Sequence, residues 1–219
     1  MRFMALFAVL SCALMAQDTE PVYRVGPGVS PPGLLHKLEP QYSQEAAKAE
    51  LVGKVLLQVV VGTDGKPRDL KVIRSLGLGL DENAIAGVGA WEFVPGNKDG
   101  QPVNVRVRIE VNFAQLEKEP KNKWHVTRVA FHLVDGSVRP VLENAVAPLV
   151  GDGAPGGTAS VKFDIDAKGD PVNVRIEKSS DQGWARDVTA ALRKWKFTPG
   201  SQNGSPVSVS CSMDFVRGN

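Results

Sequence analysis

The chain has 219 residues, of which 42% are hydrophobic and 23% are charged, a composition typical of globular rather than disordered proteins. Its formal net charge is +2, and the lysines and arginines form no basic block, which argues against nucleic acid as a partner. This length allows one or two domains.

Residues 1–16 have the layout of an export signal. Met1 and Arg2 precede an apolar run from Phe3 to Ala16, and a polar stretch follows. We expect cleavage after Ala16 and a periplasmic protein. One alternative is an uncleaved inner-membrane anchor, although a spanning helix needs about 20 apolar residues. Another is lipidation at Cys12.

Cleavage would remove Cys12 and leave Cys211 as the one cysteine of the mature chain. A single cysteine forms no internal disulfide, so packing has to stabilise the fold. Cys211 falls on the apolar side of a predicted strand, which favours a small core residue over a reactive thiol.

The chain contains an internal repeat. Residues 91–96 read WEFVPG and residues 195–200 read WKFTPG. At the same spacing, further identical residues match between the two halves: Gly65 and Gly169, Pro67 and Pro171, Ser75 and Ser179, Gly100 and Gly204, Pro102 and Pro206, and Val103 and Val207. A repeat of this size indicates two copies of one small domain.

In the first copy, the pattern predicts a short helix over 43–50, with Ser43 as its N-cap. Strands over 54–61 and 67–75 follow, joined by an Asp-Gly turn. The next apolar residues recur at the spacing of one helix face: Leu80, Ala84, Val88 and Trp91. Residues 103–113 alternate between apolar and polar, which predicts a third, half-buried strand.

The second copy repeats this order, with strands over 160–166, 171–178 and 207–215. Its helix face consists of Trp184, Val188, Leu192 and Trp195. The segment before its first hairpin differs from that of the first copy. There, residues 124–134 predict an extra strand and residues 140–147 a short helix.

Each copy is therefore predicted to be an α+β domain, a three-stranded antiparallel sheet with helices on one face. The predicted divisions are a signal peptide or short anchor (1–16), a linker (17–35), the first domain (36–113), a second linker (114–123) and a divergent second domain (124–219). The expected structural core consists of Leu80, Val88, Trp91, Phe93, Trp184, Leu192, Trp195 and Phe197. The tryptophans could instead form an aromatic binding platform, but their shared helical phase favours the core.

Patterns of catalytic or metal-binding residues are weak. Asp164, Asp166 and Asp170 suggest a calcium loop, but Lys168 and Arg175 stand where such a loop needs oxygen ligands. The three histidines are far apart or fall on opposite strand faces. We therefore predict no enzyme, no metal site, no cofactor and no small-molecule substrate.

The third strand of the first copy has two interpretations. It is either an ordinary amphipathic strand whose arginines protect an edge from aggregation, or a docking edge for a partner strand. The residues alone leave both open.

The first copy resembles the C-terminal domain of TonB energy-transducer proteins over residues 36–113. The motifs that carry the resemblance are Gly53-x-Val55, Asp64-Gly65-Lys66, Ser75, Leu80-Asp81, Trp91-x-Phe93-x-Pro95 and Gly100-x-Pro102-Val103. Residues 159–215 resemble a second, divergent copy. The family's Gln-Pro-Gln-Tyr-Pro lead-in is represented by Glu39-Pro40-Gln41-Tyr42-Ser43, which has no counterpart in the second copy.

The resemblance implies that the first copy binds the TonB box, a short N-terminal segment of outer-membrane transporters, by strand addition. The residues it implies for this contact are Pro40, Gln41, Tyr42, Val105, Arg106, Val107, Arg108 and Ile109. It also implies energy supplied by ExbB and ExbD, provided that the N-terminus is retained as an anchor. The alternative function is a soluble periplasmic interaction or scaffold protein that keeps the fold without energy coupling.

Overall fold

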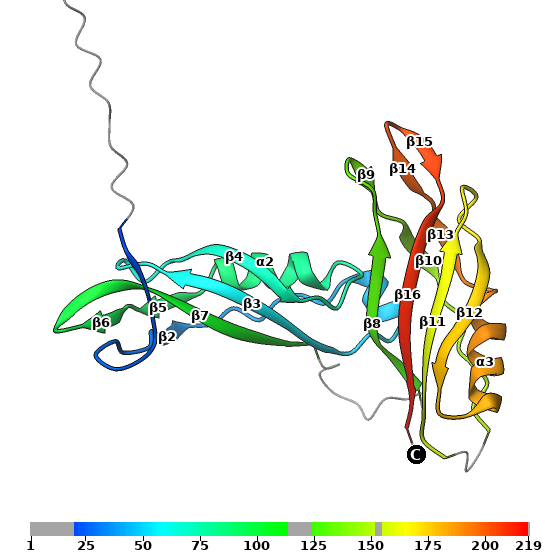
Figure 1. Ribbon diagram of the computed structural model, residues 1–219, viewed down its shortest axis with the longest axis horizontal. Helices are drawn as coiled ribbons and strands as arrows, with labels where there is room; N and C mark the ends of the chain where they lie inside the picture. Colours follow the sequence, from blue (N-terminus) through cyan, green and yellow to red (C-terminus); the bar gives the residue numbers. More distant parts are fainter. Residues whose placement is uncertain (1–19, 114–123, 152–154, 219) are drawn as a thin grey trace, which may run out of the picture.

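A computed structural model describes residues 20–113, 124–151 and 155–218, and it is mixed α+β with mostly strands (Figure 1). The first repeat contains β1 (Val22–Arg24), β2 (Gly33–His36), α1 (Gln44–Lys48), β3 (Gly53–Val61), β4 (Pro67–Arg74), α2 (Leu80–Gly89), β5 (Glu92–Val94), β6 (Gly96–Lys98) and β7 (Gln101–Phe113). The second contains β8 (Trp124–His132), β9 (Ser137–Val138), β10 (Val141–Asn144), β11 (Gly157–Ile165), β12 (Pro171–Ser179), α3 (Gln182–Leu192), β13 (Lys196–Thr198), β14 (Gly200–Gln202), β15 (Ser205–Val207) and β16 (Val209–Arg217). The predicted signal peptide and the predicted linker 114–123 lie outside the described residues.

The sheet of the first repeat has the strand order β1-β7-β3-β4, and β6 also pairs with β7. β3 and β7 run antiparallel without a register shift, from Gly53 opposite Phe113 to Val61 opposite Val105. Helix α2 contacts β3 and β4. Among the described residues, no helix combines the length and the apolar character needed to cross a lipid bilayer.

The second repeat forms a sheet with the order β12-β11-β16-β8, and α3 contacts β11 and β12. Both sheets are larger than the predicted three strands. β1 and β6 extend the first sheet, and β8, which the sequence predicted as an extra strand, extends the second. In Figure 1, the long strands of the first repeat run across the view, whereas those of the second repeat run upright.

The segments before the hairpins differ from expectation. The helix predicted over 140–147 is wrong, because residues 141–144 form β10, which pairs with β13. Leu142, opposite Phe197, is only 1% exposed, and burial in this pairing outweighs the helix propensity of so short a segment. β2 pairs with β5 in the same way in the first repeat. β1 lies within the stretch expected to be a linker (17–35), and β2 begins in it and ends at His36.

Side chains cap two of the three helices. Ser43 caps α1, since its Oγ accepts a hydrogen bond from the Ala46 N–H (3.0 Å). Asp181 caps α3 by accepting from the Trp184 N–H (2.6 Å). Helix α2 has no side-chain cap, and Asp81 in its first turn instead accepts from two backbone N–H groups of the preceding loop.

The expected core residues are buried, except that Phe93 is half-buried. Trp91 and Trp195 are 5% and 1% exposed, and each indole N–H donates to a carbonyl of the preceding segment: Leu38 O (2.7 Å) and Val146 O (2.9 Å). Buried tryptophans usually find such a partner. The pair therefore joins each helix to its lead-in segment and presents no aromatic platform.

The turns between β3 and β4 and between β11 and β12 are each hydrogen-bonded to the Trp-x-Phe-x-Pro-Gly motif of the same repeat. Phe93 N–H donates to Gly65 O, and Phe197 N–H donates to Gly169 O, both at 3.0 Å. Both glycines have positive φ angles, and an added Cβ would lie 2.0 Å from Phe93 O or 1.7 Å from Phe197 O. Only glycine fits these two turns.

The two repeats join along β8. Val52 N–H donates to Val126 O (2.9 Å), and Val126 N–H donates to Glu50 O (3.2 Å). Further along, Val129 N–H donates to Leu76 O (2.9 Å). β8 is therefore bonded on one edge to β16 and on the other to the first repeat, and buried residues of both repeats belong to one hydrophobic cluster.

An ion pair reinforces this junction. The Arg139 guanidinium donates to both carboxylate oxygens of Glu45, at 2.7 and 2.9 Å, and Leu142 N–H donates to the same carboxylate at 2.9 Å. The hydrogen bond to Glu45 raises the pKa of Arg139 above its ordinary value. Two-point contacts of this kind fix geometry as well as charge.

Candidate functional site

The outer edge of β7 is the candidate site. One edge of this strand pairs with β3 along residues 105–113. The other edge pairs with β1 in parallel, and only from Asn104 to Arg106. Among the described residues, no strand pairs with this outer edge along residues 107–113. Unpaired backbone groups of this kind form a template for an added strand.

A groove of about 800 Å3 lies beside the end of this edge. Its lining combines residues of the lead-in, α1, the end of α2 and β7: Lys37, Glu39, Pro40, Tyr42, Ala47, Trp91, Glu110, Val111, Asn112 and Phe113. The groove thus brings the Pro-Gln-Tyr lead-in next to the third strand, although these segments are far apart in the sequence.

Contacts with helix α2 hold the lead-in in place. Pro40 packs against Gly87 of α2, where an added Cβ would lie 2.7 Å from the proline ring. The Gln41 carbonyl accepts from Asn83 Nδ2 at 2.7 Å, while the Gln41 side chain is exposed. Gly87 weakens the helix, and its contact with Pro40 explains why a glycine stands there.

Tyr42 connects the lead-in to the end of β7. Its ring meets Phe113 edge to face, with centroids 6.0 Å apart, and its hydroxyl donates to Leu51 O. Burial, with the nearby charge of Glu50, raises the pKa of Tyr42 to about 12. Its hydroxyl therefore stays protonated and acts as a donor at neutral pH.

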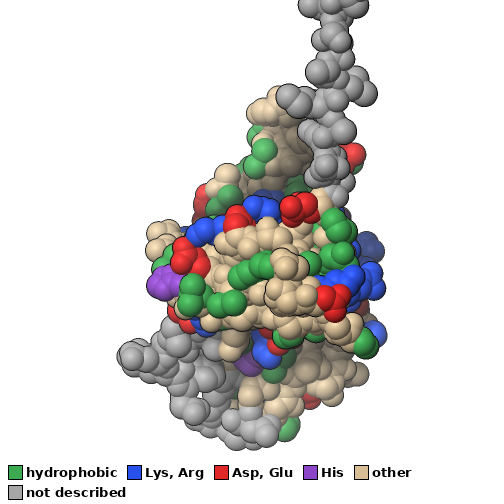
Figure 2. Space-filling model, turned by 90° about the vertical axis from the view of Figure 1, so that its left-hand side faces the viewer, with side chains coloured by type: hydrophobic (Ala, Val, Ile, Leu, Met, Phe, Trp, Pro, Cys, Tyr) green, Lys and Arg blue, Asp and Glu red, His purple; other side chains and the backbone are tan. Residues whose placement is uncertain are grey.

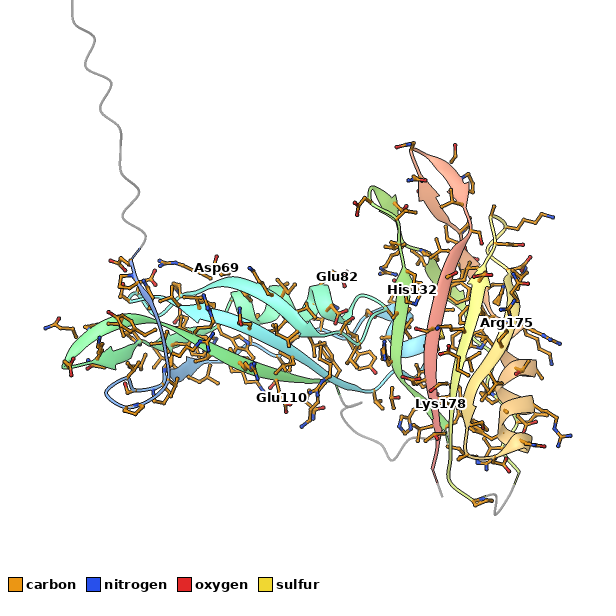
Figure 3. All side chains as sticks on the ribbon, viewed as in Figure 1. Asp69, Glu82, Glu110, His132, Arg175 and Lys178 are labelled. Atoms are coloured by element: carbon orange, nitrogen blue, oxygen red, sulfur yellow. The ribbon has the colours of Figure 1, made fainter. Side chains whose placement is uncertain are left out.

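Near the groove, exposed ion pairs join Glu110 of β7 to basic residues of β3 and β4. Glu110 forms ion pairs with Lys54 (3.0 Å) and Arg74 (3.1 Å), which lower the pKa of this carboxyl group. Figure 3 shows Glu110 on the side of the repeat opposite Asp69 and Glu82. Because all three residues are about half exposed, these pairs contribute little stability.

The predicted binding residues fall into three groups. Pro40 and Tyr42 line the groove, and Gln41 lies beside them with its side chain in solvent. Residues 107–109 lie on the uncovered part of the edge, whereas Val105 and Arg106 lie under β1. The prediction missed the groove residues at 110–113 and Lys37, because only the tertiary fold brings them together.

The equivalent edge in the second repeat is closed. β8 pairs antiparallel with β16 from Ser210 to Arg217, so the chain supplies its own edge strand there. The outer edge of β8 is in turn bonded to the first repeat. The second repeat therefore offers no counterpart of the β7 edge.

The residues weighed for other chemistry have structural roles. Asp166 accepts from the Lys168 and Asp170 N–H groups and shapes the hairpin turn. Burial raises the pKa of the Cys211 thiol, which lies in the core. In residues 20–113, 124–151 and 155–218, no three His, Cys, Asp or Glu side chains are placed to hold a metal ion.

Comparison with known proteins identifies the repeats. The family described as Gram-negative bacterial TonB protein C-terminal matches residues 39–114 and 154–216, together more than half of the chain. Protein tonB2 of Pseudomonas aeruginosa is 33% identical over 82 residues, which are 37% of this chain and 30% of that protein. Protein TonB of Vibrio cholerae is 29% identical over 78 residues, 35% of this chain and 32% of that protein.

Each of these matches spans about a third of the relative's length. The first matched segment contains α1 to β7 and the second contains β11 to nearly the end of β16, whereas β1, β2 and β8 to β10 lie outside both segments. This chain therefore belongs to the family of the C-terminal domain of Gram-negative bacterial TonB proteins, and it carries two copies of that domain.

Proposed function

We propose that the first repeat binds an extended peptide by adding it as a strand to the outer edge of β7, and that this binding serves TonB-dependent transport across the outer membrane. The partner is the N-terminal TonB box of an outer-membrane transporter. The observation that carries the proposal is the uncovered edge at residues 107–113, with the groove beside it.

Strand addition divides recognition between backbone and side chains. The backbone groups of residues 107–113 supply hydrogen bonds that do not depend on the partner's sequence. Every second side chain of the added strand faces the groove, where the half-buried Pro40 and Tyr42 offer apolar surface and Lys37 offers a charge. The site thus favours a short, mostly apolar segment.

A series of N-methylated peptides tests this mode of binding. The transporter peptide is titrated into the full chain, and each backbone nitrogen of the peptide is methylated in turn. Strand addition predicts an alternating pattern, because every second N–H donates to β7 and the others face away. Methylation at a donating position should weaken binding at least about tenfold.

The binding measurements with the methylated peptides are combined with amide hydrogen exchange of the protein. The peptide should slow amide exchange in residues 107–113 and leave β16 unchanged. Replacement of the exposed side chain in Gln41→Ala tests its contribution separately. Binding without the alternation, or protection of β16 instead of β7, contradicts strand addition at this edge.

Energy coupling depends on the N-terminus and is tested separately. We propose a periplasmic location and, if the apolar segment is retained as an anchor, contact with ExbB and ExbD. The mass of the mature protein decides between the alternatives. A chain that begins at Gln17 is not held in the inner membrane by this segment and fits the scaffold alternative, whereas a chain that begins at Met1 fits the transducer.

A further inference from the structure

We propose that β1 is an internal competitor of the partner strand. It occupies the start of the outer edge of β7 and has to leave when a partner uses the whole edge. This inference rests on the function proposed above and adds a regulatory element to the same site.

β1 holds the position that an added strand would take. Val22, Tyr23 and Arg24 lie alongside residues 104–106 of β7 in parallel register. Two side-chain contacts fasten it: Asn104 Nδ2 donates to Glu20 (3.0 Å), and the Lys98 ammonium lies 4.5 Å from the centre of the Tyr23 ring. A partner strand longer than the uncovered stretch therefore meets β1 at Arg106.

The pairing of β1 is weak. The strand has three residues, and Val22 and the following Val25 are 40% and 48% exposed. Figure 2 faces this end of the molecule and shows hydrophobic side chains standing among charged ones on the surface. Arg24 is the registered partner of Arg106 on β7, and like charges on directly paired residues disfavour pairing. Few buried contacts place β1 among the least stable parts of the fold.

The chain has a pivot directly after β1. Ser30 is fastened to β6, since its N–H donates to Asn97 O (2.8 Å) and its Oγ accepts from Asn97 N–H (2.9 Å). Between the two attachments, Gly26 and Val29 close a turn by exchanging backbone hydrogen bonds (3.3 and 3.0 Å), and Gly28 within this turn has a φ of +76°. Residues 20–25 precede this closed turn, so their release leaves the turn and residues 29–36 in place.

Release of β1 also predicts which partner is favoured. Asn104 is 8% exposed, and its Oδ1 already accepts from Thr63 N–H (3.2 Å). When β1 departs, the Asn104 amide N–H group loses Glu20 and the Lys98 ammonium loses the Tyr23 ring. A strand that supplies a carboxylate and an aromatic ring at these positions compensates for both losses. A preferred partner that adds in the parallel direction of β1 therefore carries an acidic residue shortly before an aromatic one.

Two variants of the full chain, both with Cys12→Ser, test the competition in opposite directions. Glu20→Ala with Tyr23→Ala removes the side-chain contacts and releases β1. Arg24→Cys with Arg106→Cys places two thiols at a registered pair and locks β1 when oxidised. The control, Val141→Cys with Thr198→Cys, makes the same kind of cross-link between β10 and β13, far from the edge.

The readouts are the peptide dissociation constant and the hydrogen exchange of residues 22–24. The released variant should bind at least about threefold more tightly, because less of the protein is in the blocked form. The locked variant should bind at least about tenfold more weakly than after its own reduction, and the control should not change on oxidation. In the wild-type protein, the peptide should speed exchange in β1.

The two proposals fail in different ways. Equal affinity in the released, locked and wild-type proteins, with unchanged exchange in β1, overturns the competitor and leaves strand addition standing. Absence of binding in every protein, including the released variant, overturns both.

Discussion

The outer edges of β7 and β16 are equivalent parts of two copies of one domain, but they are treated differently. β16 is covered by β8 along residues 210–217, and β8 is sealed on its far side by the first repeat. Within residues 20–113, 124–151 and 155–218, the outer edge of β7 beyond its hairpin with β6 is paired only at residues 104–106, by a three-residue strand. Because an open strand edge invites aggregation, an edge that stays open points to function, and a closed one to structure.

The lead-in segments account for this difference. In the second repeat, the chain before β9 is a long strand with an alternating pattern of buried residues. In the first repeat, the corresponding chain provides β1 and then the Pro-Gln-Tyr segment, which lines the groove. One copy completes its sheet with this stretch, and the other lines a groove with it beside a largely unpaired strand edge.

The largest expected effect tests whether the two repeats unfold as one cooperative unit. Trp195→Ala removes a ring that packs against Phe197 and Phe215, and Trp91→Ala removes one that packs against Phe93. Each should lower the free energy of unfolding by about 3–5 kcal/mol. Because the core is shared, urea unfolding followed by circular dichroism should show a single transition in both variants. Two separate transitions would mean that the repeats unfold independently.

A smaller effect tests the junction itself. Gly77 has a φ of +89°, and an added Cβ would lie 2.4 Å from Val129 O in β8. Gly100 is the matched control, because its φ of +84° carries similar backbone strain and an added Cβ meets no atom within 4 Å. Gly100→Ala should cost about 1 kcal/mol of unfolding free energy, and Gly77→Ala at least about twice that. Equal losses of unfolding free energy in the two variants would show that β8 shifts at little cost to make room for the added methyl group.

The smallest effect concerns a side chain that differs between the copies. Asp164 stands where the first repeat has the buried Val60, and hydrogen bonds from Ser210 and Asn173 lower its pKa. A lowered pKa means that these bonds stabilise the fold above the ordinary carboxyl pKa of about 3.9 and are lost as the pH falls through the folded value. Ser210→Ala should move the pKa upward, as measured by NMR titration of the carboxyl carbon. No movement would indicate that water replaces the hydroxyl.

Periodic elements of this fold could be predicted from the sequence, whereas pairings between distant segments could not. The helix faces at Trp91 and Trp195, the Asp-Gly turn and the Ser43 cap all depend on local spacing. β1 and β10 are too short to carry a pattern, and their partners lie far along the chain. The groove was missed for the same reason, because Tyr42 and Phe113 meet only after the sheet has formed.

The hairpin turns at Gly65 and Gly169 limit where this protein tolerates inserted sequence. Hairpin turns are usual positions for tags and inserted domains, but Gly65 and Gly169 each press against a phenylalanine carbonyl. A label placed there would displace the repeat's own motif. The turn between β14 and β15 is different, because an added Cβ at Gly204 meets no atom within 4 Å. A fluorophore or an affinity tag belongs at that turn, away from the edge of β7 where we propose that the partner binds.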